Sequence, residues 1–399
     1  MPASRVLITG AGGFLGSRLA HCLSLSSEKH VTGLVHSPAG ANAMRLARLP
    51  IRIEHGSIRD PETIRALAND VDTIVNCAFG MGKTSVDGTR TLLQEAESAG
   101  VENFVHLSSA VVHGHDFEGT LDETASFSPD TEYGEWKVKG EEVIEDYRSR
   151  LSFDPTIFRP FIIYGPHSHW ILDALSTVKH GAILADGGSG TLNQIYIDNL
   201  VHAIQLAIDE PEAAGETFMI ADDEAVTWRD FYEEIGRLLG SHPPVKSLTS
   251  RQIIRQRKAQ LLRDSVLPPL QIPKRIVSSR EVRMSVAGAL SKTPWAGPAL
   301  ERVPESMRSR IINQLKNGQR PDLFDHDEEN VGRQHQSELA YKFPENRLCT
   351  MQSTHGQLST SRAKSILDWE PQITFTKSMA LIDDWISYEN IFIGEESFA

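Results

Sequence analysis

The stretch Arg5-Val6-Leu7-Ile8-Thr9-Gly10-Ala11-Gly12-Gly13-Phe14-Leu15-Gly16 decides the fold of this chain. Its apolar first part predicts a short buried strand over residues 5–9, and residues 16–25 predict a helix. Between them glycine recurs at Gly10, Gly13 and Gly16. Such glycines permit a tight turn and a close approach of backbone to a pyrophosphate, which binds at the helix N-terminus. The stretch therefore predicts a dinucleotide-binding turn.

Strand-like and helix-like segments alternate through the first half of the chain, which predicts a parallel sheet covered on both faces. We expect an α/β fold: a doubly wound parallel Rossmann sheet, followed by a smaller C-terminal α/β substrate domain. Past residue 165 the pattern loosens, and no internal repeat is seen. Further strands are predicted at 31–35, 51–54, 72–78, 103–107 and 156–164, and helices at 84–99 and 133–148.

Tyr133 and Lys137 are four residues apart in a segment with helical character. This spacing puts both side chains on one face of a helix, one turn apart. An ammonium near a phenol lowers the phenol pKa from its reference of about 10, so the tyrosine exchanges protons near neutral pH. Ser109 ends the strand predicted at 103–107. Together with the glycine turn, the three residues indicate hydride-transfer chemistry with tyrosine as acid and base.

Composition narrows the possibilities further. The chain has 399 residues and a net charge of −13, which argues against a nucleic-acid partner. No apolar run reaches the ~20 residues of a membrane span, and a strand starting almost at once leaves no room for a signal peptide. Three widely spaced cysteines give no metal or disulfide pattern, so we expect no metal and a cytoplasmic location.

Several motifs resemble the extended short-chain dehydrogenase/reductase family, also called the NAD-dependent epimerase/dehydratase family. They are the glycine turn, Ser109, the Tyr133/Lys137 pair, Val86-Asp87-Gly88-Thr89, Arg159-Pro160, and Leu367-Asp368-Trp369-Glu370-Pro371. The resemblance covers roughly residues 1–238 and 355–387. It implies that Tyr133 is the acid/base, that Lys137 lowers its pKa and binds the nicotinamide ribose, and that Ser109 holds the substrate oxygen.

The resemblance also implies the residues that contact small molecules. Cofactor contacts are expected from Gly10, Gly13, Phe14, Leu15, Gly16, His36, Ser57, Ile58, Ala78, Lys137 and Pro160. Substrate contacts are expected from Ser109, Ala110, Ile162 and His167. The expected partner is a small molecule bearing a hydroxyl or keto group, and the expected cofactor is NAD(P). By analogy, the helices at 84–99 and 133–148 pair with a second subunit in a homodimer.

Departures from the family pattern bear on cofactor and substrate. The second strand ends Val35-His36-Ser37, without the acidic residue that usually selects NAD, so we favour NADP. Ala110-Val111 replaces the Asp-Glu pair of sugar-nucleotide dehydratases, which argues against that dehydration. Ile162 and Thr191 stand where nucleotide-sugar epimerases usually carry Asn and Arg to hold the substrate diphosphate. The first hypothesis is an NAD(P)-dependent oxidoreductase or epimerase that interconverts a secondary alcohol and a ketone by hydride transfer, with net redox chemistry and epimerisation both open. The alternatives are a nucleotide-sugar epimerase that uses transient oxidation and, least favoured, a non-catalytic NAD(P)-binding regulator.

The domain prediction follows the same motifs. Residues 1–165 form the NAD(P)-binding Rossmann domain, completed by parts of 191–225. Residues 166–399 form mainly the substrate domain, with an unassigned insertion at about 240–346. Residues 245–283 hold ten Lys/Arg against two Asp/Glu. They form either a solvated helical face or a surface for an anionic substrate group or an acidic membrane.

Overall fold

The computed structural model describes residues 4–36, 41–80, 82–240, 246–249, 251–253, 255–256 and 344–389. One compact unit comprises Met1–Ile253 and Ala340–Ala399. A second unit, Ile254–Leu339, lies almost wholly outside the described residues, as do most of the predicted insertion and most of the basic stretch at 245–283. The division into a cofactor domain and a substrate domain stays a prediction.

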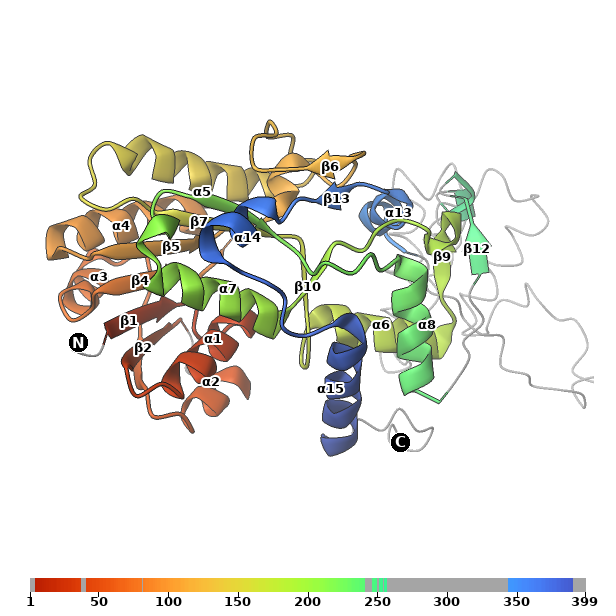
Figure 1. Cartoon of the computed structure of the whole chain (residues 1–399), viewed down its shortest axis with the longest axis horizontal. Helices are drawn as coiled ribbons and strands as arrows, with labels where there is room; N and C mark the ends of the chain where they lie inside the picture. Colours follow the sequence, from red (N-terminus) through yellow and green to blue (C-terminus); the bar gives the residue numbers. More distant parts are fainter. Residues whose placement is uncertain are drawn as a thin grey trace, which may run out of the picture. The chain divides into compact units, whose positions relative to one another are not determined.

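Seven parallel strands form the central sheet in the order β11-β7-β5-β4-β1-β2-β3 (Figure 1). β1 lies inside the sheet, and the chain winds outward from it on both sides, which confirms the predicted doubly wound fold. The strands are β1 (Ser4–Thr9), β2 (Lys29–Val35), β3 (Arg52–His55), β4 (Thr73–Asn76), β5 (Asn103–Leu107), β7 (Thr156–Pro160) and β11 (Thr217–Ile220).

Helices cover both faces of this sheet, and alternate residues of β1 pack under different helices. Leu7 joins a core cluster with side chains of α3 (Pro61–Ala68), α4 (Lys83–Ala99) and α5 (Glu132–Arg148). Val6 and Ile8 join a second cluster with α1 (Phe14–Ser24) and α7 (Ile197–Asp209). A short helix, α2 (Ala41–Leu46), follows β2. The sheet is therefore buried on both sides, as its apolar strands predict.

The strand predicted over residues 156–164 is in fact two strands. β7 ends at Pro160, and β8 (Ile162–Tyr164) leaves the sheet to pair with β10 (Gln194–Tyr196). Pro160 has no N–H to donate to a continuing ladder, so the sheet pairing stops there. β11, which the sequence pattern did not predict, takes the edge position beside β7.

The remaining described elements lie outside the seven-stranded sheet. α6 (His169–His180) packs against α8 (Trp228–Leu238), and α13 (Asn346–Ser353) lies against β9 (Ile183–Ala185). Among the described residues, no helix combines the length and apolarity that crossing a membrane requires. The other elements are η1 (Ala110–His113), β6 (Thr120–Leu121), η2 (Asp186–Gly188), η3 (Pro211–Ala213), β12 (Lys246–Leu248), β13 (Gln357–Leu358), α14 (Ser361–Leu367) and α15 (Phe375–Tyr388).

Candidate active site

The glycine turn joins β1 to α1 and is shaped to admit a ligand at the helix N-terminus. Gly10 has φ +67°, and a Cβ placed there would lie 2.7 Å from the backbone N and Cα of Ala78. A Cβ at Gly16 would collide with the Gly10 carbonyl. Gly13 is the N-cap of α1 and has no side chain to cap it, and Phe14 and Leu15 begin the helix. This backbone cradle fits the pyrophosphate of a dinucleotide.

Gly10→Ala is therefore expected to weaken dinucleotide binding by at least about tenfold and to destabilise the fold by about 1–3 kcal/mol. The reason is that alanine is strained at φ +67° and its Cβ meets the Ala78 backbone. Calorimetric titration with NAD⁺ and NADPH measures the affinity. Gly12→Ala is the matched control, because its Cβ would make only ordinary contact with Val35, at 3.6 Å. Equal affinity in both variants would count against the turn as the binding site.

The other predicted cofactor residues differ in how exposed their side chains are. His36 is exposed just after β2, and the Ser57 hydroxyl accepts a hydrogen bond from the Arg59 N–H at 3.2 Å. The Ile58 side chain is buried in the core against Gly88. Arg45, from α2, lies with its Nη2 3.0 Å from His167 Nδ1.

Ser109 and Tyr133 come together at the carboxyl end of β5. Ser109 caps η1, and its hydroxyl donates to the Pro160 carbonyl at 3.1 Å. The Ser109 side chain lies close enough to the Tyr133 hydroxyl to lower its pKa. Thr131 caps α5 by accepting from the Gly134 N–H at 3.1 Å, which places Tyr133 in the first turn of the helix. The predicted pair is thus assembled from two separate elements.

Lys137 completes the cluster one turn further along α5. Its side chain is 6% exposed, its Nζ donates to the Leu107 carbonyl at 2.5 Å, and it lies 5.8 Å from the Tyr133 ring centroid. Burial lowers the pKa of Lys137 to about 8. Burial also raises the pKa of Tyr133, while the nearby Ser109 hydroxyl and the charge of Arg347 act in the opposite direction. The net shift of the Tyr133 pKa is upward, opposite to the lowering expected from Lys137, because burial outweighs the other causes and Lys137 is not among them. Tyr133 is therefore a protonated acid at neutral pH in this structure.

A buried ion pair supports this cluster from below, and the sequence reasoning missed it. Arg159 and Glu141 are 7% and 4% exposed, with Nη2 2.5 Å from Oε2. Glu141 also accepts from the hydroxyl of Ser108, the neighbour of Ser109. Arg159 Nη1 lies 3.1 Å from His113 Nε2. The pair thus connects α5, β7 and the segment carrying Ser109. The available signal was that Glu141 follows Lys137 by four residues, on the same helix face.

A second buried chain of side chains crosses the ends of three neighbouring strands. The Thr9 hydroxyl donates to Asn76 Oδ1 at 2.7 Å, and Asn76 Nδ2 lies 3.1 Å from His106 Nδ1. Burial and the nearby Lys137 charge lower the pKa of His106 to about 3, so this imidazole is neutral. These hydrogen-bonded side chains hold β1, β4 and β5 together close to the glycine turn and Lys137.

Of the other predicted substrate residues, Ala110 and Ile162 are buried. Ala110 packs with Met219, Ala221 and Leu358, and Ile162 packs in the cluster under α1 and α7. His167 is partly exposed, with φ +70°, and its ring meets Trp385 edge-on at 4.7 Å.

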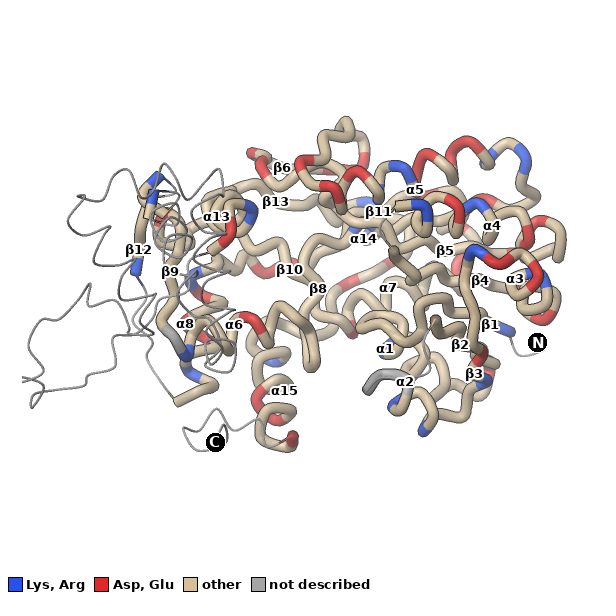
Figure 2. The backbone as a smooth tube through the Cα atoms, turned by 180° about the vertical axis from the view of Figure 1, so that it is seen from behind, with Lys and Arg blue, Asp and Glu red and all other residues tan. Residues whose placement is uncertain are grey.

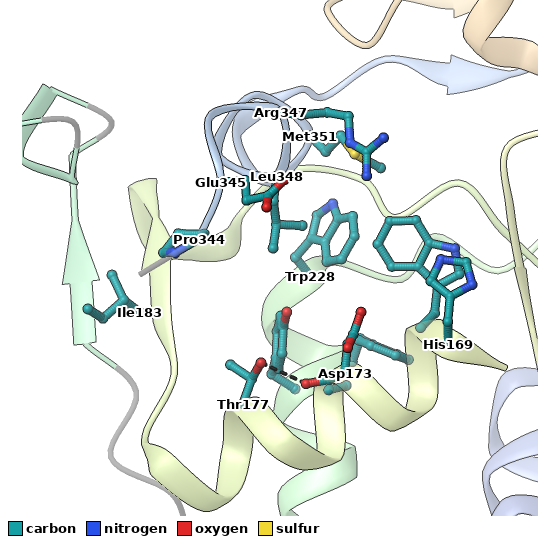
Figure 3. Close-up of a pocket in the computed structure, with 14 residues that line it drawn as sticks. His169, Asp173, Thr177, Ile183, Trp228, Pro344, Glu345, Arg347, Leu348 and Met351 are labelled. Atoms are coloured by element: carbon teal, nitrogen blue, oxygen red, sulfur yellow. Dashed lines mark hydrogen bonds between the residues drawn. The ribbon is translucent and has the colours of Figure 1, made fainter. Parts of the chain in front are cut away.

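A cavity of about 280 Å³ opens between α6, α8 and α13 (Figure 3). Its walls include Trp170, Trp228 and Tyr232, and its polar lining includes Asp173 and Arg347. Because the charge of Arg347 also acts on Tyr133, the cavity lies within electrostatic reach of the candidate acid. Within the described ranges, no group of three or more His, Cys, Asp or Glu side chains is arranged to hold a metal ion.

Comparison with known families decides the assignment. Residues 6–221 match the NAD dependent epimerase/dehydratase family. The chain belongs to this family. The predicted family is thereby confirmed, and with it the predicted enzyme class, an NAD(P)-dependent oxidoreductase or epimerase of the short-chain dehydrogenase/reductase type.

Relatives within the epimerase/dehydratase family differ in their reactions. A UDP-glucose 4-epimerase of Vibrio cholerae is 27% identical over 257 residues, 59% of this chain and 75% of the relative. A 3β-hydroxysteroid dehydrogenase/Δ5→4-isomerase of Mycobacterium tuberculosis is 28% identical over 267 residues, 60% of this chain and 70% of the relative. A UDP-glucuronic acid 4-epimerase of Bacillus cereus, solved with NAD, shares the fold: its TM-score is 0.63 at 18% identity, covering 96% of this chain and 99% of that one.

The buried lysine of this family member makes its stability pH-dependent. The pKa of Lys137 is about 8 in the folded protein against 10.5 as its ordinary value. The unfolded chain therefore holds the proton more tightly, and folding stability rises with pH between those two values. Lys137→Met cannot titrate, so the stability difference between variant and wild type should shift by up to about 3 kcal/mol from pH 7 to pH 10.5. Urea unfolding across this range measures it. A pH-independent difference would contradict the lowered pKa.

Proposed function

We propose that this protein interconverts a secondary alcohol and a ketone, with Tyr133 as the acid/base. The observation that carries the proposal is the grouping of three side chains: Ser109 acts on the Tyr133 hydroxyl, and Lys137, buried one helical turn away, has its Nζ 5.8 Å from the Tyr133 ring centroid. The glycine turn fits a nicotinamide dinucleotide, which when bound supplies or accepts the hydride. Gly10, Gly13, Gly16 and the backbone of Phe14 and Leu15 would hold it.

The chain's own residues account for the proton and for the orientation of the substrate. Ser109 donates a hydrogen bond to the reacting oxygen and positions it beside Tyr133. Tyr133 gives its proton to that oxygen when a ketone is reduced, and takes it back when an alcohol is oxidised. The Lys137 ammonium stabilises the phenolate that remains, because opposite charges in a buried site attract strongly.

A hydride-transfer assay tests this function directly. NADH and NADPH absorbance is followed with a panel of ketones and, in reverse, with secondary alcohols and NAD⁺ or NADP⁺. Oxidation or reduction of any panel member that also requires Tyr133 supports the proposal. Failure with every member, combined with tight dinucleotide binding, would favour the remaining class, a non-catalytic NAD(P)-binding regulator.

For the cofactor, NADP is proposed over NAD. No acidic residue follows β2, and His36 is exposed where a 2′-phosphate would lie. The comparisons offer no support for NADP, since the solved relative of Bacillus cereus was crystallised with NAD. Titration with both cofactors decides: a lower Kd for NADPH that is lost in His36→Asp supports the proposal, and equal Kd values refute it.

Nucleotide-sugar epimerisation is the second candidate, favoured by the Vibrio cholerae relative and by Arg347, a cation that acts on Tyr133. In an epimerase the ketone is transient and the hydride returns to the opposite face. The cofactor then never needs to leave. Mass spectrometry of nucleotide released on denaturing the purified protein separates the two: retained NAD⁺ or NADH favours epimerisation, and an empty protein favours net oxidation or reduction.

We also propose a homodimer and a cytoplasmic location. None of the three cysteines forms a disulfide within the described residues, which suits a reducing cytoplasm. The homodimer rests on analogy, and α5 carries charged residues along its length (Figure 2). Among the described residues, no exposed large apolar side chain lies on α4 or α5. A dimer formed through these helices would therefore have a polar interface, and a monomer in light scattering would remove this proposal.

A further inference from the structure

Phe79 is a large aromatic residue whose position is not explained by packing of the core. It follows Ala78, the residue whose backbone lies against Gly10 at the glycine turn, and it is 38% exposed. Among the described residues it belongs to none of the hydrophobic core clusters. Its aromatic and cation–π contacts there are with Tyr133 and Lys137. The ring of Phe79 therefore belongs to the candidate active site.

The three side chains contact one another in pairs. The Phe79 and Tyr133 rings meet edge-on, with centroids 4.8 Å apart and planes inclined at 67°. Lys137 Nζ lies 4.8 Å from the Phe79 ring centroid and 5.8 Å from the Tyr133 ring centroid. Both distances fall within the ~6 Å over which an aromatic face attracts a cation. The Lys137 ammonium is therefore attracted by both rings, and it lies nearer to Phe79.

The Lys137 ammonium has little else to stabilise its charge. It carries three N–H donors, and among the described residues its single hydrogen-bond acceptor is the Leu107 carbonyl, at 2.5 Å. Glu141, one turn further along α5, acts on it electrostatically but is ion-paired with Arg159. Lys137 is only 6% exposed, and a buried charge without compensation is costly. The electron-rich face of the Phe79 ring supplies part of the missing compensation.

The other titratable groups that face Lys137 do not change their charge near pH 8. Burial raises the pKa of the Cys77 thiol, directly after β4, to about 12, and lowers the pKa of His106 on β5 to about 3. Burial also raises the pKa of Tyr133, and Glu141 is engaged in its buried ion pair. Burial lowers the pKa of Lys137 to about 8. A titration near this pH therefore reports on Lys137.

We propose that Phe79 is a positioning residue that holds the charged ammonium of Lys137 beside Tyr133 through the face of its ring. The inference rests on the proposed function, in which this ammonium stabilises the Tyr133 phenolate. Phe79 exchanges no proton itself and acts only through Lys137. Phe79→Leu keeps much of the apolar bulk and removes the aromatic face, whereas Phe79→Tyr keeps the face. The two substitutions therefore separate the electrostatic effect of the ring from the effect of its bulk.

The titration of Lys137 in the full-length protein, without cofactor, is the first test. Protein containing ¹³C-labelled lysine is followed by NMR from about pH 6 to pH 10, and Lys137→Met identifies the Lys137 signal. In Phe79→Leu the midpoint is expected to fall by about 0.5–1 pH unit, because the charged form loses a contact that favours it. In Phe79→Tyr the midpoint is expected to remain that of the wild type, because the aromatic face is retained.

The matched control for this titration is Trp136→Leu. It removes a ring of the same helix that lies over Lys139, with Nζ 4.1 Å from the ring centroid, and it is expected to leave the Lys137 midpoint unchanged.

Three results would overturn the proposal. An unchanged midpoint in Phe79→Leu, or equal changes in Phe79→Leu and Phe79→Tyr, would show that the aromatic face does not hold the ammonium. A midpoint that moves to higher pH would show that the ring only keeps water away from Lys137. An equal change in Trp136→Leu would show that any disturbance of α5 produces the effect.

Turnover in ketone reduction gives the second readout. Because the ammonium is required as a cation, the high-pH limb of the kcat–pH profile is expected to move to lower pH in Phe79→Leu, by the same amount as the NMR midpoint. Phe79→Tyr is expected to restore the wild-type profile. A kcat that is lowered equally at every pH would indicate a structural role and would overturn the positioning role of Phe79.

The proposed function is judged separately, because the NMR titration requires no turnover. Hydride transfer together with an unchanged Lys137 midpoint in Phe79→Leu would remove the role of Phe79 and leave the function intact. A lowered midpoint in a protein that transfers no hydride would show that Phe79 holds the ammonium and would remove the function.

Discussion

Tyr133→Phe is expected to lower turnover by about 10²–10⁴-fold, the usual contribution of a positioned acid or base. The change removes only the hydroxyl beside Ser109, while the ring retains its edge-on contact with Phe79 at 4.8 Å. The reacting oxygen then has no proton donor or acceptor at this position. The measurement is kcat for the first substrate found in the hydride-transfer assay, in wild type and variant.

The control for this prediction lies on the same helix. Tyr147→Phe removes a hydroxyl that accepts from Gln94 Nε2 at 2.8 Å near the end of α5, away from Ser109. It is expected to leave kcat within about twofold, since an exposed hydrogen bond contributes little. Dinucleotide affinity should be unchanged in Tyr133→Phe, because the glycine turn does not involve this hydroxyl. Unchanged kcat in Tyr133→Phe would remove Tyr133 from the catalytic role.

The sequence predicted the parts of the site that depend on local spacing. A four-residue separation places Tyr133 and Lys137 on one helix face wherever that helix lies, and the glycines mark a strand-to-helix turn whatever surrounds them. The parallel sheet followed from apolar strands alternating with helices. These features depend on residues close together in the sequence, so they can be predicted without a structure.

Features built from distant residues were not predictable in this way. The Arg159–Glu141 pair joins β7 to α5, and the local sequence of neither segment indicates which residue its charge will pair with. The cavity brings Trp228 together with Arg347, residues more than a hundred positions apart. Similarly, residues 156–164 form one apolar run, and only the competing pairing of β8 with β10 shows that the run contains two strands.

Arg159→Met is expected to destabilise the protein by about 3–5 kcal/mol, because it leaves the Glu141 carboxylate buried without its counter-charge. Arg159 donates to Glu141 from both Nε and Nη2, and both side chains are almost fully enclosed. Urea unfolding at pH 7 measures the loss. Arg148→Met is the matched control: Arg148 pairs with Glu145 near the end of α5, where Glu145 is largely exposed, so a change of at most about 1 kcal/mol is expected.

The double variant Arg159→Met/Glu141→Leu identifies the source of the loss. If the cost of Arg159→Met comes from an unpaired buried carboxylate, removing that carboxylate should recover much of the stability. Turnover should not recover with it. Glu141 also accepts from Ser108, so without that carboxylate the segment carrying Ser109 is held less firmly against α5. Restored stability with kcat still lowered would show that the pair positions Ser109 relative to Tyr133. Recovery of both would reduce the pair to a purely structural contact, and recovery of neither would mean that Arg159 stabilises the fold through His113 or Glu123 instead.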